Sequence, residues 1–82
     1  METEVKIEEA REILRHNVRY FRKSRNLTQA ALAERMGIAQ PNIAQIEAGK
    51  RSPSFETLIS LADALGVAPD LLLRSEVFSE VA

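Results

Sequence analysis

Apolar residues recur every three or four positions along most of the chain, which is the period of an α-helix that buries one face. No segment alternates between apolar and polar residues for long enough to predict a strand. The expected fold class is therefore all-α. The pattern predicts five helices, of which four span about residues 7–25, 28–36, 40–48 and 54–65, and a short fifth begins at Pro69.

The breaks between these predicted helices hold the three glycines of the chain, and the three prolines lie in those breaks or at the helix starts. Glycine and, less often, asparagine adopt the left-handed conformation that ends a helix. Proline is tolerated in the first helical turn, where its missing N–H loses no intrahelical bond. The predicted helix ends are at Asn26, Gly37, Gly49 and Gly66. The prolines stand at the predicted starts, at Pro41, Pro53 and Pro69.

The inward positions of the predicted helices give an expected core. The second and third helices, of about nine residues each, are too short to be stable alone in water and must pack on the others. Two short helices joined at Gly37 are typical of a helix-turn-helix, whose second helix enters the DNA major groove; any other small helical bundle is the alternative. The inward residues are Ile7, Ala10, Leu14, Val18, Phe21, Leu32, Ala33, Met36, Ile43, Ile46, Leu58, Leu61, Ala62, Leu65, Leu71 and Leu72.

Composition excludes several kinds of site. A chain of 82 residues forms one small domain. It has no cysteine and a single histidine, His16, so it can build neither a cysteine-ligated metal site nor a histidine cluster that would hold a transition metal. We expect no enzyme activity, no metal or other cofactor and no small-molecule ligand. No apolar run is long enough for a membrane span, and no signal peptide is recognisable, so the expected location is the cytoplasm.

Charge is distributed unevenly along the chain, although the net charge is only −1. Residues 17–53 carry seven arginines and lysines against two glutamates. Residues 1–16 and 54–82 both carry more acidic than basic side chains. A polyanion could therefore dock on the middle of the chain; a solvated basic surface is the alternative.

Residues 27–66 contain a series of residues whose identities and spacing resemble those of the lambda-repressor/Cro-like (XRE-type) helix-turn-helix family. The resemblance extends weakly to Val18 and Leu72. It implies a five-helix lambda-repressor-like DNA-binding domain. It also implies a sequence-specific transcriptional regulator, a repressor or autoregulator, that binds a palindromic double-stranded operator as a homodimer. The residues that carry the resemblance are Leu27-Thr28-Gln29, Leu32-Ala33-Glu34, Met36-Gly37-Ile38, Ile43, Ile46-Glu47, Gly49-Lys50-Arg51, Pro53-Ser54 and Leu65-Gly66-Val67.

The resemblance makes the third predicted helix the recognition helix. Because Ile43 and Ile46 face inward, the base-reading candidates lie on the other side. The carboxamide of Gln40 can pair with both N6 and N7 of adenine, and Asn42 and Gln45 can offer the same chemistry, brace Gln40 or contact a phosphate. The candidates are Gln40, Pro41, Asn42, Ala44 and Gln45.

Phosphate contacts are expected at the start of the second helix and in the loop after the third. Free N–H groups at a helix start favour an anion, and loop cations fix the register on the duplex without reading sequence. Arg19, Lys23 and Arg25 would add attraction at longer range. The resemblance also implies a partly buried ion pair between Arg22 and Glu47. The phosphate-contact candidates are Thr28, Gln29, Lys50 and Arg51.

The expected organisation is an N-terminal extension of the first helix (residues 1–12), the DNA-binding domain (13–73) and a tail (74–82). Apolar residues at the end of the chain favour a dimer contact made by the fifth helix and the tail. The alternative is that they cover the core of their own protomer. These residues are Leu73, Val77, Phe78 and Val81.

A second function remains possible from the sequence. The chain could be a protein-interaction module, such as an antitoxin or a partner of another regulator, with DNA binding secondary. The amides of Gln40 and Gln45 favour DNA, because an interaction surface would present large apolar anchors there. A restriction-modification controller, an antitoxin and a phage-type repressor are not distinguished.

Overall fold

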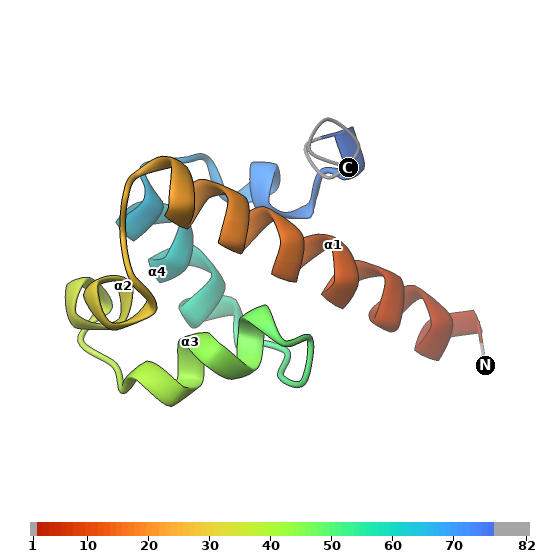
Figure 1. Cartoon of the computed structure of the whole chain (residues 1–82). Helices are drawn as coiled ribbons and strands as arrows, with labels where there is room; N and C mark the ends of the chain where they lie inside the picture. The colour runs from red at the N-terminus through yellow and green to blue at the C-terminus, as the bar shows by residue number, and fades with distance from the viewer. Residues whose placement is uncertain (1, 77–82) are drawn as a thin grey trace.

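The computed structural model describes residues 2–76, which contain four α-helices and one 3₁₀ helix (Figure 1). The expected all-α class is confirmed for these residues. Four of the five predicted helices are α-helices, and the count of five is not confirmed, because the fifth predicted segment forms a short 3₁₀ helix. The elements are α1 (Glu2–Ser24), α2 (Gln29–Met36), α3 (Gln40–Glu47), α4 (Phe55–Leu65) and η1 (Pro69–Leu73).

The 3₁₀ form of η1 has a local and a tertiary cause. Short segments favour the tighter i to i+3 bonding, and Leu71 N donates to Ala68 O at 3.0 Å in that pattern. The side chain of Asn17 in α1 donates through Nδ2 to the carbonyl oxygens of η1 and its cap, at 2.9 Å for Leu72 and 3.1 Å for Arg74. These are carbonyls that a continuing α-helix would use, so Asn17 fixes where η1 ends.

Asn17 is a buried polar residue that the apolar pattern did not reveal. It is 0% exposed, and its Oδ1 is buried with no hydrogen-bond partner among the described residues. Hydrophobic periodicity counts only apolar positions, so a polar residue on the inward face of a helix reads as an interruption. Its partners, 54 to 57 residues away in the sequence, carry no local signal.

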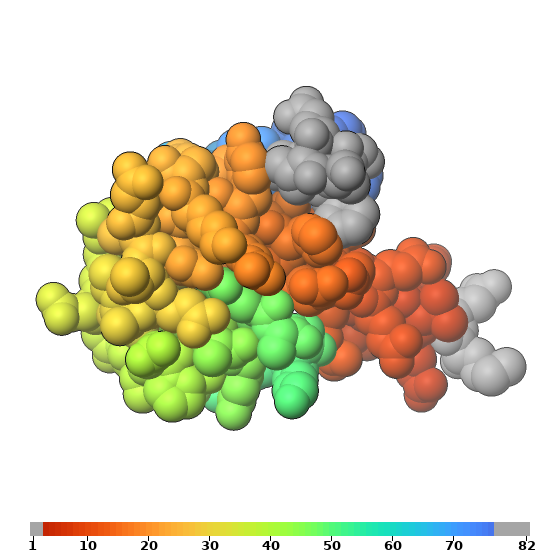
Figure 2. Space-filling view, viewed as in Figure 1, coloured from red at the N-terminus to blue at the C-terminus, as the bar shows by residue number. Residues whose placement is uncertain are grey.

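α1 is longer than predicted, and its first turns project beyond the other helices (Figures 1 and 2). Residues 3–10 are all exposed, and Ile7 is 45% exposed. The expectation that Ile7 and Ala10 face the core is therefore wrong. Because the domain ends before the helix does, their apolar face has no neighbouring helix to pack on fully.

The predicted helix ends are confirmed by backbone geometry. Asn26 has φ of 57°, and the three glycines have φ between 70° and 73°. The apolar residue after each of three stops donates its N–H back into the preceding helix, as in Leu27 N to Arg22 O at 3.1 Å and Ile38 N to Ala33 O at 3.0 Å. Side-chain oxygens of Thr28 and Ser54 cap the starts of α2 and α4.

The core lies between α1, α4 and the α2–α3 pair, and every buried apolar residue belongs to the predicted inward set. Met36, Leu58 and Leu71 are partly buried against this core. The short helices α2 and α3 are thus held by packing, which leaves the other side of α3 at the surface (Figure 1). The buried residues are Leu14, Val18, Phe21, Leu32, Ala33, Ile43, Ile46, Leu61, Ala62, Leu65 and Leu72.

Candidate nucleic-acid interface

α3 presents one apolar and one polar face. Ile43 is 0% exposed and Ile46 is 2% exposed, so both anchor the helix in the core. The side chains of Gln40 and Gln45 are exposed. Of the other three residues that the sequence suggested for base reading, Pro41 is exposed, and Asn42 and Ala44 are half-buried. A surface helix that displays amides is suited to contact the edges of bases.

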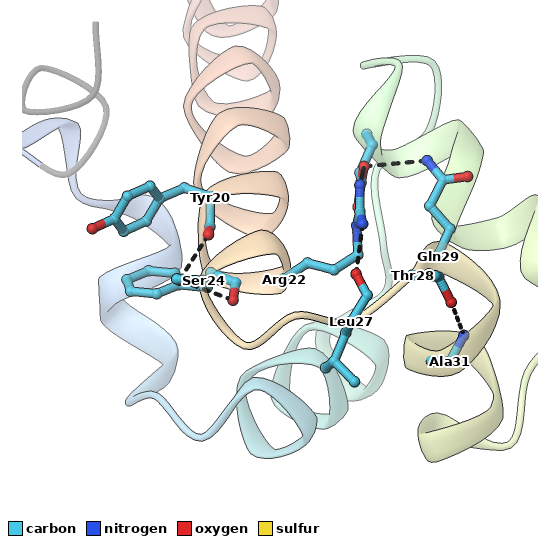
Figure 3. A network of polar contacts seen from close by, with 9 residues as sticks. Tyr20, Arg22, Ser24, Leu27, Thr28, Gln29 and Ala31 are labelled. Carbon is cyan, nitrogen blue, oxygen red and sulfur yellow. Dashed lines mark hydrogen bonds and ion pairs between the residues drawn. The ribbon is translucent and has the colours of Figure 1, made fainter.

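A buried ion pair connects α1 to the end of α3. Arg22 Nε donates to Glu47 Oε2 at 2.6 Å, and Arg22 Nη2 donates to Oε1 at 2.9 Å. The two side chains are only 10% and 5% exposed. Arg22 Nη1 also donates to the carbonyl oxygen of Leu27 at 2.7 Å, so one guanidinium joins α1, the loop before α2, and α3 (Figure 3). This forked contact fixes α3 against α1 and against the loop before α2.

The start of α2 lies against the same ion pair. The side chain of Gln29 donates through Nε2 to Glu47 Oε1 at 3.2 Å, so its amide is directed at the carboxylate (Figure 3). Thr28 Oγ1 accepts from Ala31 N at 3.0 Å and caps the helix. Two residues suggested for phosphate contact therefore also have structural partners. The N-terminus of α2, which is the positive end of its helix dipole, lies beside α3.

A polar hollow of about 300 Å³ opens where α1, the start of α2 and the end of α3 meet. Its lining includes Arg19, Gln29, Ala44 and Ala48. Arg19 is exposed, whereas the charge of Arg22 below it is compensated by Glu47. Sequence reasoning assigned Arg19 only long-range attraction, because its distance from α3 could not be known before the helices were packed.

Arg51 and Asn42 form a contact on the other side of α3. Arg51 Nη1 donates to Asn42 Oδ1 at 2.6 Å, which links the loop after α3 back to its first turn. Asn42 therefore contacts Arg51, and no hydrogen bond between Asn42 and Gln40 is present among the described residues. Lys50 and Arg51 are both exposed, so the loop carries two cations at the surface.

Arg25 was suggested as a long-range cation, but it has a structural role. Its Nε donates to the carbonyl oxygen of Leu65 at 2.8 Å, and its guanidinium lies 5.2 Å from the centre of the Phe21 ring. Arg35 also donates to a carbonyl at the end of α4, Ala64 O at 3.2 Å. Both cations stabilise the negative end of that helix.

Two arginines of α1 approach the loop after α3. Arg11 Nε donates to Ser52 Oγ at 2.7 Å. Arg15 lies over Gly49, where an added Cβ would come within 3.2 Å of its Cδ. Hydrogen bonds that Arg15 donates hold the pKa of the Glu12 carboxyl below its ordinary value. The sequence balance of this segment was acidic, so its contact with the basic loop was not predicted.

Among residues 2–76, no group of three or more potential ligands could hold a metal ion. No helix in that part of the chain has the length and hydropathy needed to cross a membrane.

Comparisons with known proteins agree with this geometry. A family model described as helix-turn-helix matches residues 18–72. The uncharacterized HTH-type transcriptional regulator YqaE of Bacillus subtilis is 38% identical over 60 residues, which are 73% of this chain and 52% of that protein. Control protein C.SmaI of Serratia marcescens is 41% identical over 71 residues, 85% of this chain and 84% of that protein.

A solved structure shows the same fold. The restriction-modification controller protein C.AhdI from Aeromonas hydrophila superposes with a TM-score of 0.71 at 28% sequence identity. The alignment covers 73% of this chain and 91% of that one. The matched family segment includes α2, α3 and the Arg22–Glu47 pair.

Proposed function

The chain belongs to the helix-turn-helix family of DNA-binding transcriptional regulators, and we propose that it acts in the cytoplasm as a homodimer that represses or autoregulates by binding a palindromic operator. The observation that carries the proposal is the surface of α3, where Gln40 and Gln45 are exposed beside the cations of residues 50–51. Amides of this kind read base edges in the major groove.

Each part of the interface then has a role. Residues of α3 read bases, with Gln40 pairing with an adenine and Pro41 and Ala44 making apolar contacts. Lys50, Arg51 and the start of α2 hold phosphates on the two sides of the groove. Thr28 contributes through its hydroxyl, which can donate to a phosphate while it caps the helix.

The hollow at Arg19 supports a phosphate contact on the α2 side of α3. Gln29 would hold the phosphate through its backbone N–H, since its side-chain amide is directed to Glu47. The buried Arg22–Glu47 pair lies beneath and keeps α2 and α3 in fixed relation. The base-reading and phosphate-holding groups thus approach the duplex as one rigid unit.

The dimer contact is proposed at η1 and the tail. Leu73 is 46% exposed and lies beside an apolar groove of about 330 Å³, whose lining includes Ile7, Ala10 and Leu58. Of the tail residues suggested for this contact, Val77, Phe78 and Val81 lie outside the described residues. A second copy on this groove would bury apolar surface that is otherwise in water.

The test of DNA recognition is selection from double-stranded oligonucleotides with a randomised core. We expect one enriched palindromic word, with half-site centres about 34–36 Å apart or a multiple of that distance. The affinity for this duplex should fall steeply as salt rises, because phosphate contacts release counterions. A library with no enriched word, or an affinity that is independent of salt, would contradict the proposal and favour the protein-interaction alternative.

The test of the dimer is the mass of the protein and of its complex with the selected duplex. Leu73→Glu should lower the dimer fraction and the operator affinity, because it places a carboxylate against the groove. Val5→Glu is the matched control, since Val5 is 53% exposed on the projecting part of α1. If the two variants have the same dimer fraction and the same operator affinity, the dimer contact is not at η1.

A further inference from the structure

The loop after α3 (residues 48–54) carries two cations, and backbone hydrogen bonds tie only its start to α3. The N–H of Lys50 donates to Gln45 O at 3.0 Å. Within the described residues, the N–H groups of Arg51 and Ser52 donate to no backbone carbonyl. The position of the loop after Lys50 therefore depends on contacts that side chains make.

Arg11 and Arg15 of α1 supply such contacts. Arg11 Nε donates to Ser52 Oγ at 2.7 Å. The stem of Arg15 passes close to Gly49, where an added Cβ would come within 3.2 Å of Arg15 Cδ. The two arginines are four residues apart, so they lie on the same side of the helix. They contact the loop at the residue directly before its two cations and at the residue directly after them.

The charge around these arginines is compensated by carboxylates. Arg15 donates through Nε and Nη2 to the two carboxylate oxygens of Glu12, at 2.7 Å and 2.6 Å. A polar hollow of about 300 Å³ is lined by Glu8, Glu12, Arg11 and Gly49. A phosphate placed there would meet two carboxylates, and like charges brought together oppose binding. The arrangement is therefore suited to hold the loop and is not suited to bind an anion.

We propose that Arg11 and Arg15 are positioning residues for DNA binding, which hold the loop so that Lys50 and Arg51 meet phosphates. This inference rests on the proposed function. Arg51 also holds the loop, through Asn42 Oδ1, but the proposed function directs the Arg51 side chain at DNA. A loop that is ordered before it binds does not lose its conformational freedom at that step, and this loss would lower the affinity.

The experiment measures the affinity for the duplex that the wild-type chain enriches. Arg11→Ala and Ser52→Ala remove the same hydrogen bond, and Ser52→Ala does so without a change of charge. Each should lower the affinity about tenfold, and the double variant should lower it by the same factor, because the two changes remove one contact. Lys6→Ala is the matched control, since Lys6 is an exposed cation on the projecting part of α1. It should change the affinity by less than about twofold.

The contribution of the Arg15 stem is measured at constant charge. Glu12→Gln is combined with Arg15→Met, which keeps an unbranched stem over Gly49, and separately with Arg15→Ala, which removes the stem. Both double variants lack the two charges of the pair. We expect the variant with methionine to have the higher operator affinity. Equal affinities of the two would overturn the role of Arg15.

The salt dependence separates positioning from a direct phosphate contact. Each phosphate contact contributes about −0.9 to the slope of log K against log salt concentration. Arg11→Ala should leave this slope unchanged, because the loop cations still reach their phosphates once the loop is ordered. If the slope becomes shallower by about 0.9 and Ser52→Ala has no effect, Arg11 itself binds a phosphate and the proposal is overturned.

A chain without the loop cations shows whether Arg11 acts through them. When Lys50→Ala and Arg51→Ala are both present, Arg11→Ala should cause no further loss of affinity. The full loss in that background would overturn the proposal, because Arg11 would then act by another route. Thermal melting checks that the variants are folded. The Arg11 to Ser52 hydrogen bond is exposed, so the melting temperature should change by only a few degrees.

Failure of this inference differs from failure of the proposed function. If the wild type enriches a word, and the Arg11 and Ser52 variants bind it as tightly as the wild type does, only the positioning role is lost. If the wild type binds duplexes but enriches no word, sequence-specific recognition fails. The same variants then test the positioning role on any duplex, since phosphate contacts supply non-specific binding. If the wild type binds no duplex, both proposals fail.

Discussion

Removal of Arg22 is the most direct test of how α3 is held. Arg22→Ala deletes both hydrogen bonds to Glu47 and the one to Leu27 O, and leaves a carboxylate whose side chain is 5% exposed. Within the described residues, the remaining side-chain donor to that carboxylate is Gln29, at 3.2 Å. Breaking a buried ion pair by removing one partner costs about 3–5 kcal/mol, because an uncompensated charge stays buried.

The expected loss is large compared with the stability of so small a domain. A loss of 1 kcal/mol lowers the melting temperature of a domain of this size by about 4–8 °C, so Arg22→Ala should lower it by about 12–40 °C. Thermal melting followed by far-UV circular dichroism measures the shift. Lys23→Ala is the control, because Lys23 is the neighbouring exposed cation of α1. It should change the melting temperature by only a few degrees.

A double variant separates the buried charge from the loss of packing. Arg22→Leu combined with Glu47→Leu removes both charges and keeps apolar volume, so it should recover most of the stability that Arg22→Ala loses. It also gives a result if Arg22→Ala fails to fold. The reasoning is refuted if Arg22→Ala leaves both the melting temperature and the operator affinity unchanged, or if the double variant is less stable than Arg22→Ala.

Three further predictions concern Asn17, Thr28 and Glu12. In urea unfolding, Asn17→Asp should destabilise the fold more than Asn17→Ala, because it turns an acceptor toward the three carbonyls that Asn17 Nδ2 contacts. An Asp variant with the stability of the wild type would mean that the amide of Asn17 is oriented the other way. Thr28→Ala should cost about 0.5–2 kcal/mol in the same measurement, since it removes the cap on Ala31 N, whereas Thr28→Ser should cost less. Hydrogen bonds from Arg15 lower the pKa of the Glu12 carboxyl, so the stability that this carboxylate contributes is present above about pH 4.5 and is lost as the pH falls through its lower pKa in the folded state. Glu12→Gln should reduce the fall in melting temperature at acid pH, and an unchanged fall would refute the assignment.

The sequence by itself determined the presence of four α-helices, the residues at which they end, and the residues that are buried in the apolar core. These features depend on local rules: the period of apolar residues, the left-handed conformation at Asn26 and the glycines, and the side-chain caps. All buried apolar residues were predicted for the same reason, because the spacing of apolar residues along an amphipathic helix identifies the face that it buries. Where a helix extends beyond its neighbours, as at Ile7, the same rule fails because no partner is present.

Only the tertiary structure decided how polar side chains are used. Arg25 and Arg35 hold the end of α4, Asn17 holds η1, and Arg51 takes the oxygen of Asn42. The sequence could not assign these partners, because hydrogen bonds between distant segments depend on how the helices pack and leave no periodic signal. The family resemblance implied a partly buried Arg22–Glu47 pair, whereas the bonds of this pair to Leu27 and Gln29 follow from the packing of three elements around it.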